Sequence, residues 1–291
     1  MGIVARSPVF RKFINEFGCY KEINSYLCSN LCVESTESET EPCHMTKNKQ
    51  RNEGMTIIPI AHFRSPLKSK FGIPRQSGLA NSLEGVIVLE PDYRHPEALR
   101  GIEDFDFLWL IWEFSANKTG ETESQPSSSK EHLTVRPPLL GGNKRMGVFA
   151  TRSPFRPNRL GLSSVRLQRI DWEDAEGPVI YVSGADLMDG TPIYDIKPYL
   201  RYVDSHPDAR GGFTDTHQWE KLTVIIPEEI RATLNPQDQQ TLQELLELDP
   251  RPHYQDDPDR IYGFTFNDRD CHFRVRERVA EVLSLGDISK K

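Results

Sequence analysis

The sequence predicts a mainly β fold, with an antiparallel or mixed sheet that curls toward a barrel. From Met55 onward, short runs rich in Val, Ile, Phe, Tyr and Trp alternate with Gly, Pro, Asn and Asp, as strands alternate with turns. Helix candidates are few in this region, and residues 95–102 offer one or two turns. The even spacing of many short runs is typical of a closed or nearly closed sheet.

Taken in chain order, the expected strands of this sheet come first and a different pattern follows. The predicted strands are residues 57–63, 86–89, 105–114, 146–150, 165–170, 179–183 and 193–203. Beyond them, Asn235 and Pro236 provide an N-cap and a first-turn proline for a helix, which Asp249 and Pro250 end. Residues 261–266, 271–275 and 280–285 read as three further strands.

The composition divides the chain into three predicted parts. Residues 1–54 form an N-terminal extension that is expected to be flexible, because segment 34–53 is polar and offers little apolar surface to bury. Residues 55–211 form the β-barrel domain, interrupted by a polar loop at 117–131. Residues 212–291 form a small α+β domain.

Hydropathy and charge limit the function classes. No apolar run reaches the roughly 20 residues of a membrane span, so no membrane partner is expected. The net charge of −7 disfavours nucleic-acid binding, but a net charge does not show how the charges are distributed along the chain. Segment 136–169 carries seven Arg and one Lys and no acidic residue, a charge of +8 over 34 residues. A polyanionic partner for this segment therefore stays open.

The five cysteines indicate a reducing compartment. They are odd in number and come without a visible secretory signal, so a cytoplasmic location is expected. Four of them could in principle bind zinc, but they lack the paired C-x2-C spacing of zinc modules, and free thiols are the preferred interpretation. No metal is expected. The cysteines are Cys19, Cys28, Cys32, Cys43 and Cys271.

The sequence contains no familiar nucleotide-binding or hydrolase motif. Within the predicted β region, three segments are rich in polar residues. The first is Pro74-Arg75-Gln76, where a proline-fixed backbone presents two long polar side chains; an ordinary surface loop is an equal alternative. The second is a proline-stiffened loop carrying Arg152, Arg156 and Arg159. Arginine on a rigid loop suits bidentate capture of carboxylate or phosphate, against the alternative of a solvated basic loop.

The third place is the strand after a D-G-T-P turn. Asp195, Lys197 and Tyr199 alternate along it and share one face. An acid, a base and a phenol together form a plausible catalytic or recognition set. An exposed strand face with a salt bridge is the alternative.

These stretches, in this order, resemble the TsaA-like family, also called tRNA (adenine-N6)-methyltransferase O. The resemblance covers about residues 55–285 and also includes D-P-R-P-H-Y at 249–254. The principal matching stretches are I-P-I-A-H-F-R-S-P (58–66), P-R-Q (74–76), V-R-P-P-L-L-G-G-N-K-R-M-G-V-F-A-T-R-S-P-F-R-P-N (135–158) and D-L-M-D-G-T-P-I-Y-D-I-K-P-Y (186–199).

The resemblance implies a fold, a reaction and partners. The fold is a single-sheeted β-barrel that binds S-adenosyl-L-methionine. The reaction is methylation of N6 of N6-threonylcarbamoyladenosine at position 37 of tRNA. The resemblance also implies a homodimer with the active site near the subunit interface.

Matched position by position, the resemblance implies the site residues. The cofactor contacts are Pro74, Arg75, Gln76, Ser115, Ala116, Arg152, Leu162, Met188, Asp189, Gly190 and Thr191. With this chemistry, Asp195, Tyr199 and Lys197 become the catalytic candidates, and Lys144, Arg145, Arg156 and Arg159 the candidates for binding tRNA or the threonyl carboxylate.

One departure keeps a second function class open. Family members usually have His where this chain has Ser115, so a side-chain hydrogen bond from this position is in doubt. The alternative is a non-catalytic β-barrel that binds S-adenosylmethionine or RNA. A small-molecule methyltransferase is a third interpretation, which the +8 segment disfavours because a neutral substrate needs no such surface.

Overall fold

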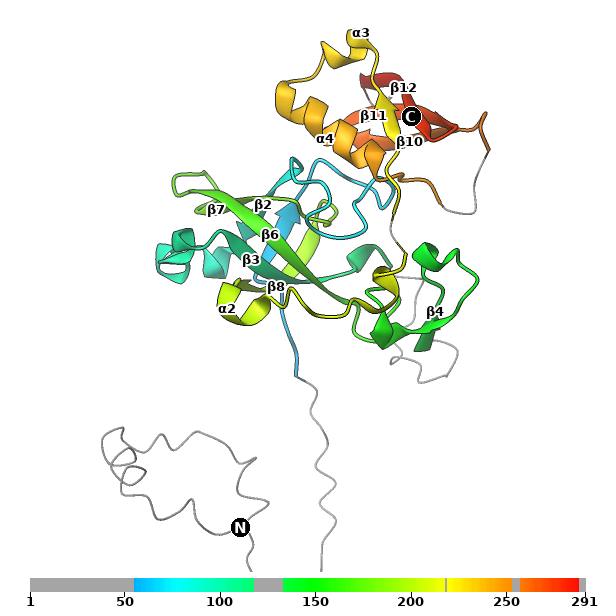
Figure 1. The fold of residues 1–291 in the computed structure, drawn as a ribbon. Helices are drawn as coiled ribbons and strands as arrows, with labels where there is room; N and C mark the ends of the chain where they lie inside the picture. The colour runs from blue at the N-terminus through cyan, green and yellow to red at the C-terminus, as the bar shows by residue number, and fades with distance from the viewer. Residues whose placement is uncertain (1–54, 118–132, 218, 253–256, 288–291) are drawn as a thin grey trace, which may run out of the picture. The chain divides into compact units, whose positions relative to one another are not determined.

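The computed structural model describes residues 55–117, 133–217, 219–252 and 257–287 (Figure 1). Met55–Lys291 forms one compact unit. The predicted extension at 1–54, its four cysteines and nearly all of the 117–131 loop lie outside the described residues. Within the described residues, no helix is long and apolar enough to cross a membrane.

Six strands close into a barrel, which confirms the predicted fold class. They follow one another around the barrel in the order β1-β2-β7-β6-β3-β8, and every neighbouring pair is antiparallel. The strands are β1 (Ala61–Arg64), β2 (Glu84–Leu89), β3 (Phe107–Glu113), β6 (Leu160–Asp171), β7 (Val179–Ser183) and β8 (Thr191–Pro198).

Alternation along the strands fills the barrel. In β3, Leu108, Leu110 and Trp112 point inward and are at most 5% exposed, whereas the residues between them are only partly buried. This is the period of two that places successive side chains on opposite faces of a sheet. The inner residues pack with Phe63, Ile87 and other apolar side chains into one core.

Short elements connect the barrel strands. The two-residue strands β4 (Thr134–Val135) and β5 (Met146–Gly147) pair with each other. The 3-10 turns are η3 (Pro91–Tyr93), η4 (Pro96–Leu99), η5 (Ile102–Asp104), η6 (Ser115–Asn117), η8 (Pro138–Leu140), η9 (Val148–Ala150) and η10 (Gly212–Thr214). The short helices are α2 (Arg201–Asp204) and α3 (Glu228–Arg231).

The C-terminal part is a four-stranded sheet with one helix against it (Figure 1). Helix α4 (Pro236–Glu247) begins as predicted, because the Asn235 side chain accepts a hydrogen bond from the Asp238 amide at 2.8 Å. Leu242, Leu245 and Leu246 are buried on one face of it. The strands are β9 (Thr223–Ile225), β10 (Ile261–Phe266), β11 (Arg269–Arg276) and β12 (Val279–Asp287).

Four strand predictions differ from the structure by more than two residues at one end. Strand β1 begins at Ala61, four residues after the predicted start. Strand β6 begins at Leu160, five residues before the predicted start, because its backbone pairs with β3 through Gly161 and Ser163, which carry no β preference. The strand predicted at 193–203 ends at Pro198 and gives way to α2. The run at 146–150 is a two-residue strand followed by the turn η9.

Candidate active site

A cavity of about 460 Å³ gathers most of the residues expected to bind the cofactor. Five segments far apart in the sequence line it: the loop after β1, the end of β3 with η6, the arginine loop, the start of β6 and the turn before β8. The expected residues that line it are Pro74, Arg75, Gln76, Ser115, Ala116, Arg152, Leu162, Met188 and Thr191.

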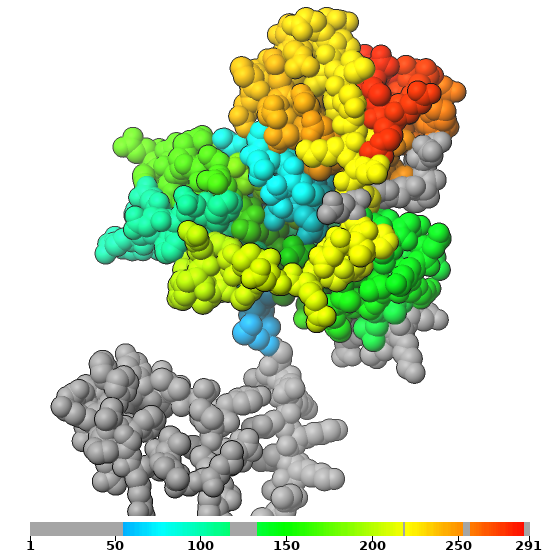
Figure 2. Space-filling view, in the orientation of Figure 1, coloured from blue at the N-terminus to red at the C-terminus, as the bar shows by residue number. Residues whose placement is uncertain are grey.

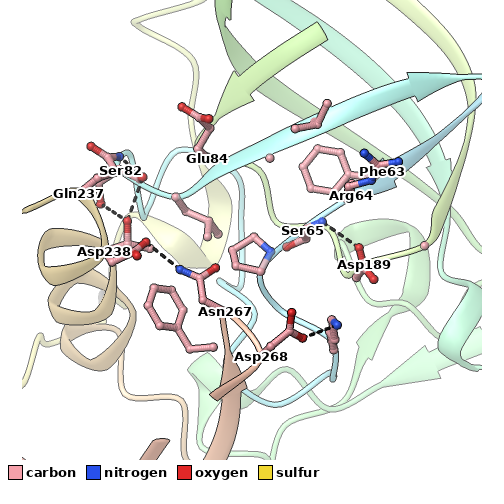
Figure 3. A pocket seen from close by; sticks show the side chains of 18 of the residues that line it. Phe63, Arg64, Ser65, Ser82, Glu84, Asp189, Gln237, Asp238, Asn267 and Asp268 are labelled. Atoms are coloured by element: carbon pink, nitrogen blue, oxygen red, sulfur yellow. Dashed lines mark hydrogen bonds and ion pairs between the residues drawn. The ribbon is translucent and has the colours of Figure 1, made fainter. Parts of the chain in front are cut away.

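Asp189 and Gly190 do not line this cavity. The Asp189 carboxylate instead accepts a hydrogen bond from the Ser65 amide at 3.0 Å (Figure 3), and the Gly190 amide donates to the Phe63 carbonyl at 2.8 Å. Gly190 has a φ of +73°, in the left-handed region that glycine adopts without strain. These two residues therefore fix the turn that presents Met188 and Thr191 to the cavity.

The groove in Figure 3 is a separate hollow of about 760 Å³, lined by β1, β2 and the C-terminal segments. Its polar side chains bind one another. Lys68 pairs with Asp268, and the Asn267 amide donates to Asp238 at 2.8 Å. The groove lies between strands β1 and β2 on one side and α4 and the β10–β11 turn on the other.

The guanidinium of Arg75 is held by backbone carbonyls at the end of α4. It donates to the Leu248 carbonyl at 2.5 Å and to the Asp249 carbonyl at 2.6 Å, and it lies 4.0 Å from the centre of the Trp219 ring. Burial lowers the pKa of Arg75 from its ordinary value, opposed by the charge of Asp249. Arg75 therefore shapes the cavity wall from a fixed position.

Arg152 and Gln76 meet across the cavity mouth. The Arg152 guanidinium donates to the Gln76 side-chain oxygen at 2.8 Å. This bond orients the amide of Gln76 and leaves further guanidinium hydrogens for a ligand, since arginine carries five donors. Two of the segments expected to contact the cofactor are thus directly connected.

A hydrogen-bonded chain at the cavity wall was not predicted from the sequence. Trp112 Nε1 donates to Ser163 Oγ at 2.9 Å, and Ser163 Oγ donates to Asp186 Oδ1 at 2.5 Å. Burial raises the pKa of Asp186, while the Ser163 bond and the positive charge of Arg152 oppose the rise. The sequence signal available for this site was a lone carboxylate between Ala185 and Leu187 at the end of an apolar strand.

A second carboxylate of the cavity has partners of its own. Glu113 accepts a hydrogen bond from the Tyr194 hydroxyl at 2.7 Å and pairs with Arg159 at 3.3 Å. Desolvation, together with Glu113, raises the pKa of Tyr194 to about 12. Tyr194 is therefore a hydrogen-bond donor at neutral pH, and Glu113 is held in place on both sides.

The three catalytic candidates lie together, but none of them lines the cavity. Lys197 Nζ pairs with Asp195 Oδ2 at 2.8 Å, and the Tyr199 ring packs against Phe107 and Trp109 at 6.2 and 5.8 Å between centres. Asp195 and Lys197 lie opposite Ile111 and Trp109, on the outer side of the barrel. The predicted shared face of the strand is therefore the outer face of the barrel and not the face that lines the packed interior.

The basic residues lie around a larger hollow of about 1580 Å³. It shares Gln76, Arg152 and other residues with the smaller cavity, so the two hollows are continuous. Segment 133–159 (green in Figure 2) meets residues 211–214 there. Of the candidates for tRNA binding, Arg145, Arg156 and Arg159 line this hollow, whereas Lys144 is exposed outside it.

Two large apolar side chains are exposed among these arginines. Phe149 is 76% and Phe155 is 66% exposed, and both line the larger hollow. Exposed aromatic rings beside cations form a surface suited to flat, negatively charged partners or to another protein chain. In the described residues, no cluster of three or more His, Cys, Asp or Glu side chains could hold a metal ion.

Comparison with known proteins identifies the family of this fold and site. The family model described as tRNA-methyltransferase O N-terminal domain matches residues 62–205, and the TrmO C-terminal domain matches residues 219–288. The tRNA (adenine(37)-N6)-methyltransferase of Escherichia coli is 38% identical over 234 residues, which cover 78% of this chain and 95% of that protein.

Two further relatives agree. A Pseudomonas aeruginosa protein named "Putative S-adenosylmethionine-dependent methyltransferase RcsF" is 40% identical over 79% of this chain and 97% of its own. A crystal structure of TrmO from Pseudomonas aeruginosa has a TM-score of 0.60 and 30% identity, covering 80% of this chain and 98% of that chain.

The closed barrel, taken with these relatives, is the fold of a methyltransferase. More specifically, the chain belongs to the tRNA-methyltransferase O family. The resemblance stated from the sequence motifs is thereby confirmed.

Proposed function

We propose that this chain transfers a methyl group from S-adenosylmethionine to N6 of adenosine 37 in tRNA, and that the accepting nucleoside is N6-threonylcarbamoyladenosine. The observation that carries the proposal is one cavity lined by nine of the residues expected to contact the cofactor. The names of the Escherichia coli and Pseudomonas aeruginosa relatives support the reaction and the methyl donor.

The cavity suits the donor in size and chemistry. Its volume of about 460 Å³ lies within the roughly 300–1,000 Å³ typical of small-molecule sites. Trp112, Phe114 and Leu160 offer apolar surface for a purine ring, and Arg152 and Asp186 offer opposite charges for a zwitterionic chain. Backbone segments 74–76 and 115–116 would supply further contacts.

When bound, S-adenosylmethionine supplies an electrophilic methyl group on a sulfonium. The contribution of the protein is to hold the accepting amine in line with that methyl group and to exclude water, which is the proximity effect. The N6 lone pair is weakened by conjugation with the purine and the carbamoyl group. A side chain that accepts the N6 proton would therefore assist the transfer.

Asp195 and Tyr199 remain our proposed proton acceptors, with Lys197 holding Asp195. Because they lie on the outer face of β8, this role requires the nucleoside to reach that face. Asp195→Asn is expected to lower turnover about a hundredfold, within the usual range for a proton-transfer group. A normally folded Asp195→Asn enzyme with unchanged turnover would exclude it as the acceptor.

The threonyl carboxylate and the tRNA backbone need cations. We propose that Arg145, Arg156 or Lys197 binds the carboxylate and that Lys144, Arg159 and the rest of segment 136–169 face phosphates. Substitution of the carboxylate-binding residue should reduce the preference for threonylcarbamoylated over plain adenosine. Equal loss on both nucleosides would assign that residue to the backbone instead.

We also propose a homodimer in which the partner subunit adjoins the site. The exposed Phe149 and Phe155 beside the continuous hollows support a partner surface there. Sedimentation equilibrium of wild type and Phe149→Ser tests this: the variant should dissociate at a higher protein concentration than the wild type. A monomeric wild type would contradict the proposal.

The direct test is mass spectrometry of nucleosides after incubating the full chain with S-adenosylmethionine and tRNA. Threonylcarbamoylated tRNA should gain one methyl group on the modified adenosine, and the same tRNA lacking that group should gain little. Equal methylation of both tRNAs would contradict the preference for threonylcarbamoyladenosine and would support only the methylation of adenosine 37. Donor binding without methylation would favour the non-catalytic binding module, with Ser115→His as the next variant.

A further inference from the structure

Asp186 is a carboxylate set into an apolar part of the barrel and directed at the cavity. It follows β7, and its neighbours Ala185 and Leu187 are each 1% exposed. Asp186 itself lines the cavity together with Trp112 and Met188. Its carboxylate therefore has little access to bulk water except through the space that a ligand would fill.

The orientation of this carboxylate is fixed from the opposite strand. Ser163 on β6, 1% exposed, donates to Asp186 Oδ1 at 2.5 Å, and its own oxygen accepts from Trp112 Nε1 at 2.9 Å. The backbone amides of Asp186 itself and of Ser77 also hydrogen-bond the carboxylate. All three donors are neutral, so the carboxylate is oriented without a charged partner.

Charge distinguishes Asp186 from the other acid of the cavity. Glu113 has a cation at 3.3 Å in Arg159 and a phenol donor in Tyr194. Among the described residues, Asp186 has no cation within 4.0 Å, and Arg152 acts on it only from farther away. A desolvated carboxylate with neutral donors only is less favourable than one that also has a cationic partner. A buried carboxylate in a cleft, with its pKa raised by desolvation, is a candidate for a functional site.

We propose that Asp186 contacts a cationic group of the ligand that occupies this cavity. The inference rests on the proposed function, in which the ligand is S-adenosylmethionine. That ligand has two positive groups, the sulfonium and the α-ammonium. Either of them would place a positive charge next to the carboxylate that Ser163 orients. The contact anchors the ligand at the wall that Trp112 and Ser163 build.

Titration calorimetry on the full chain tests the inference with three ligands. S-adenosylmethionine carries both cations, S-adenosylhomocysteine only the ammonium, and 5′-methylthioadenosine neither. Asp186→Asn keeps the shape and an acceptor for Ser163 but removes the charge. Asp92→Asn, an exposed aspartate of η3, is the matched control for net charge.

Asp186→Asn should weaken S-adenosylmethionine binding at least about tenfold, because a charge-assisted hydrogen bond is replaced by a neutral one. If S-adenosylhomocysteine weakens equally and methylthioadenosine is unaffected, the ammonium is the partner. If only S-adenosylmethionine weakens, the sulfonium is the partner. Both results support the inference. An affinity within about twofold of Asp92→Asn, or equal loss for all three ligands, overturns it.

Two further measurements separate other failures. A wild type that binds none of the three ligands overturns the proposed function and this inference together, whereas unchanged binding with lost turnover would make Asp186 a proton acceptor instead.

If Asp186→Asn does not fold, Ser163→Ala retains the charge but frees the carboxylate. It should weaken S-adenosylmethionine about threefold or more relative to methylthioadenosine, and parity between the two ligands overturns the inference.

Discussion

The ionisation of two single residues, one beside the barrel cavity and one in the C-terminal core, is set by their apolar surroundings. Asp186 and Cys271 are both ionisable groups placed among apolar neighbours, and burial raises the pKa of each. Asp186 opens on a cavity, whereas Cys271 is 0% exposed within the C-terminal core. The same physical effect therefore has different consequences: Asp186 is a carboxylate that a ligand in the cavity could reach, whereas Cys271 is an unreactive thiol.

The ligand-free protein should be more stable, or equally stable, at pH 7 with Asp186→Asn. Because the folded-state pKa of Asp186 is raised above its ordinary value of 3.8, the folded protein binds more protons than the unfolded chain. Stability is then present at low pH and falls as pH rises through that window. Calorimetric melting should show the advantage of the variant at pH 7 and its disappearance below about pH 4. An advantage that is independent of pH would contradict this account.

Cys271 should resist alkylation in the native protein. Burial raises the pKa of its thiol to about 12, so the thiolate fraction at pH 8 is on the order of a thousandfold below that of an ordinary cysteine. Iodoacetamide labelling followed by peptide mass mapping should modify the Cys271 peptide only after guanidinium unfolding. The peptides with the other cysteines provide a comparison within each sample. Rapid native labelling of Cys271 would show that β11 opens locally.

At the scale of elements, strand pairing builds the cavity wall. Gly161 on β6 and Trp112 on β3 are direct partners in the antiparallel pairing of these two strands. A Cβ atom on Gly161 would lie 2.3 Å from the Trp112 indole. The indole therefore occupies space that only glycine leaves free, and from there it reaches Ser163.

Gly161→Ala should destabilise the protein by about 1–3 kcal/mol, as overpacking usually does, and weaken ligand binding through the displaced indole. Gly286→Ala is the matched control, because Gly286 also lies in a strand and a Cβ there meets no atom within 4 Å. Urea unfolding and calorimetry measure the two effects. Equal behaviour of both variants would refute the packing argument.

At the scale of the whole molecule, an acidic chain presents one strongly basic surface. The +8 of segment 136–169 lies beside the cavity within a chain of net charge −7. Such a polarised charge distribution attracts and orients a polyanion while the acidic remainder repels it. The larger hollow with Arg145 and Arg156 is the expected contact region.

Arg136→Gln should weaken tRNA binding and reduce the slope of log K against log salt concentration by about one, since one phosphate contact is lost. S-adenosylmethionine affinity should stay unchanged, because Arg136 does not line the smaller cavity. Filter binding over a salt series measures the slope. Arg100→Gln, an exposed arginine outside the basic segment, is the control. Identical slopes for the two variants would argue against a phosphate contact.

Sequence reasoning predicted the fold class, most strands and the segments that meet at the cavity, because long motifs and period-two alternation carry that information. It placed Asp189 and Gly190 in the cofactor set; in the structure they bond Ser65 and Phe63 and do not line the cavity, and their cofactor contact stays a prediction. It missed Asp186, because its partner Ser163 lies 23 residues earlier in the chain, on another strand, and no local pattern shows that contact. Strand β9 was missed since three residues pairing in parallel leave no periodic signal.

The anchoring of Arg75 makes the end of a distant helix part of the support of the smaller cavity. A helix leaves its last carbonyl groups without partners inside the helix. Those of Leu248 and Asp249 at the end of α4 are taken up by a guanidinium from the cavity loop, some 173 residues earlier in the chain. A change that shifts this helix end therefore alters the pocket without touching any residue inside it. Substitutions at the end of α4 should therefore change the shape of the cavity, and the barrel domain alone should lack the fully formed cavity.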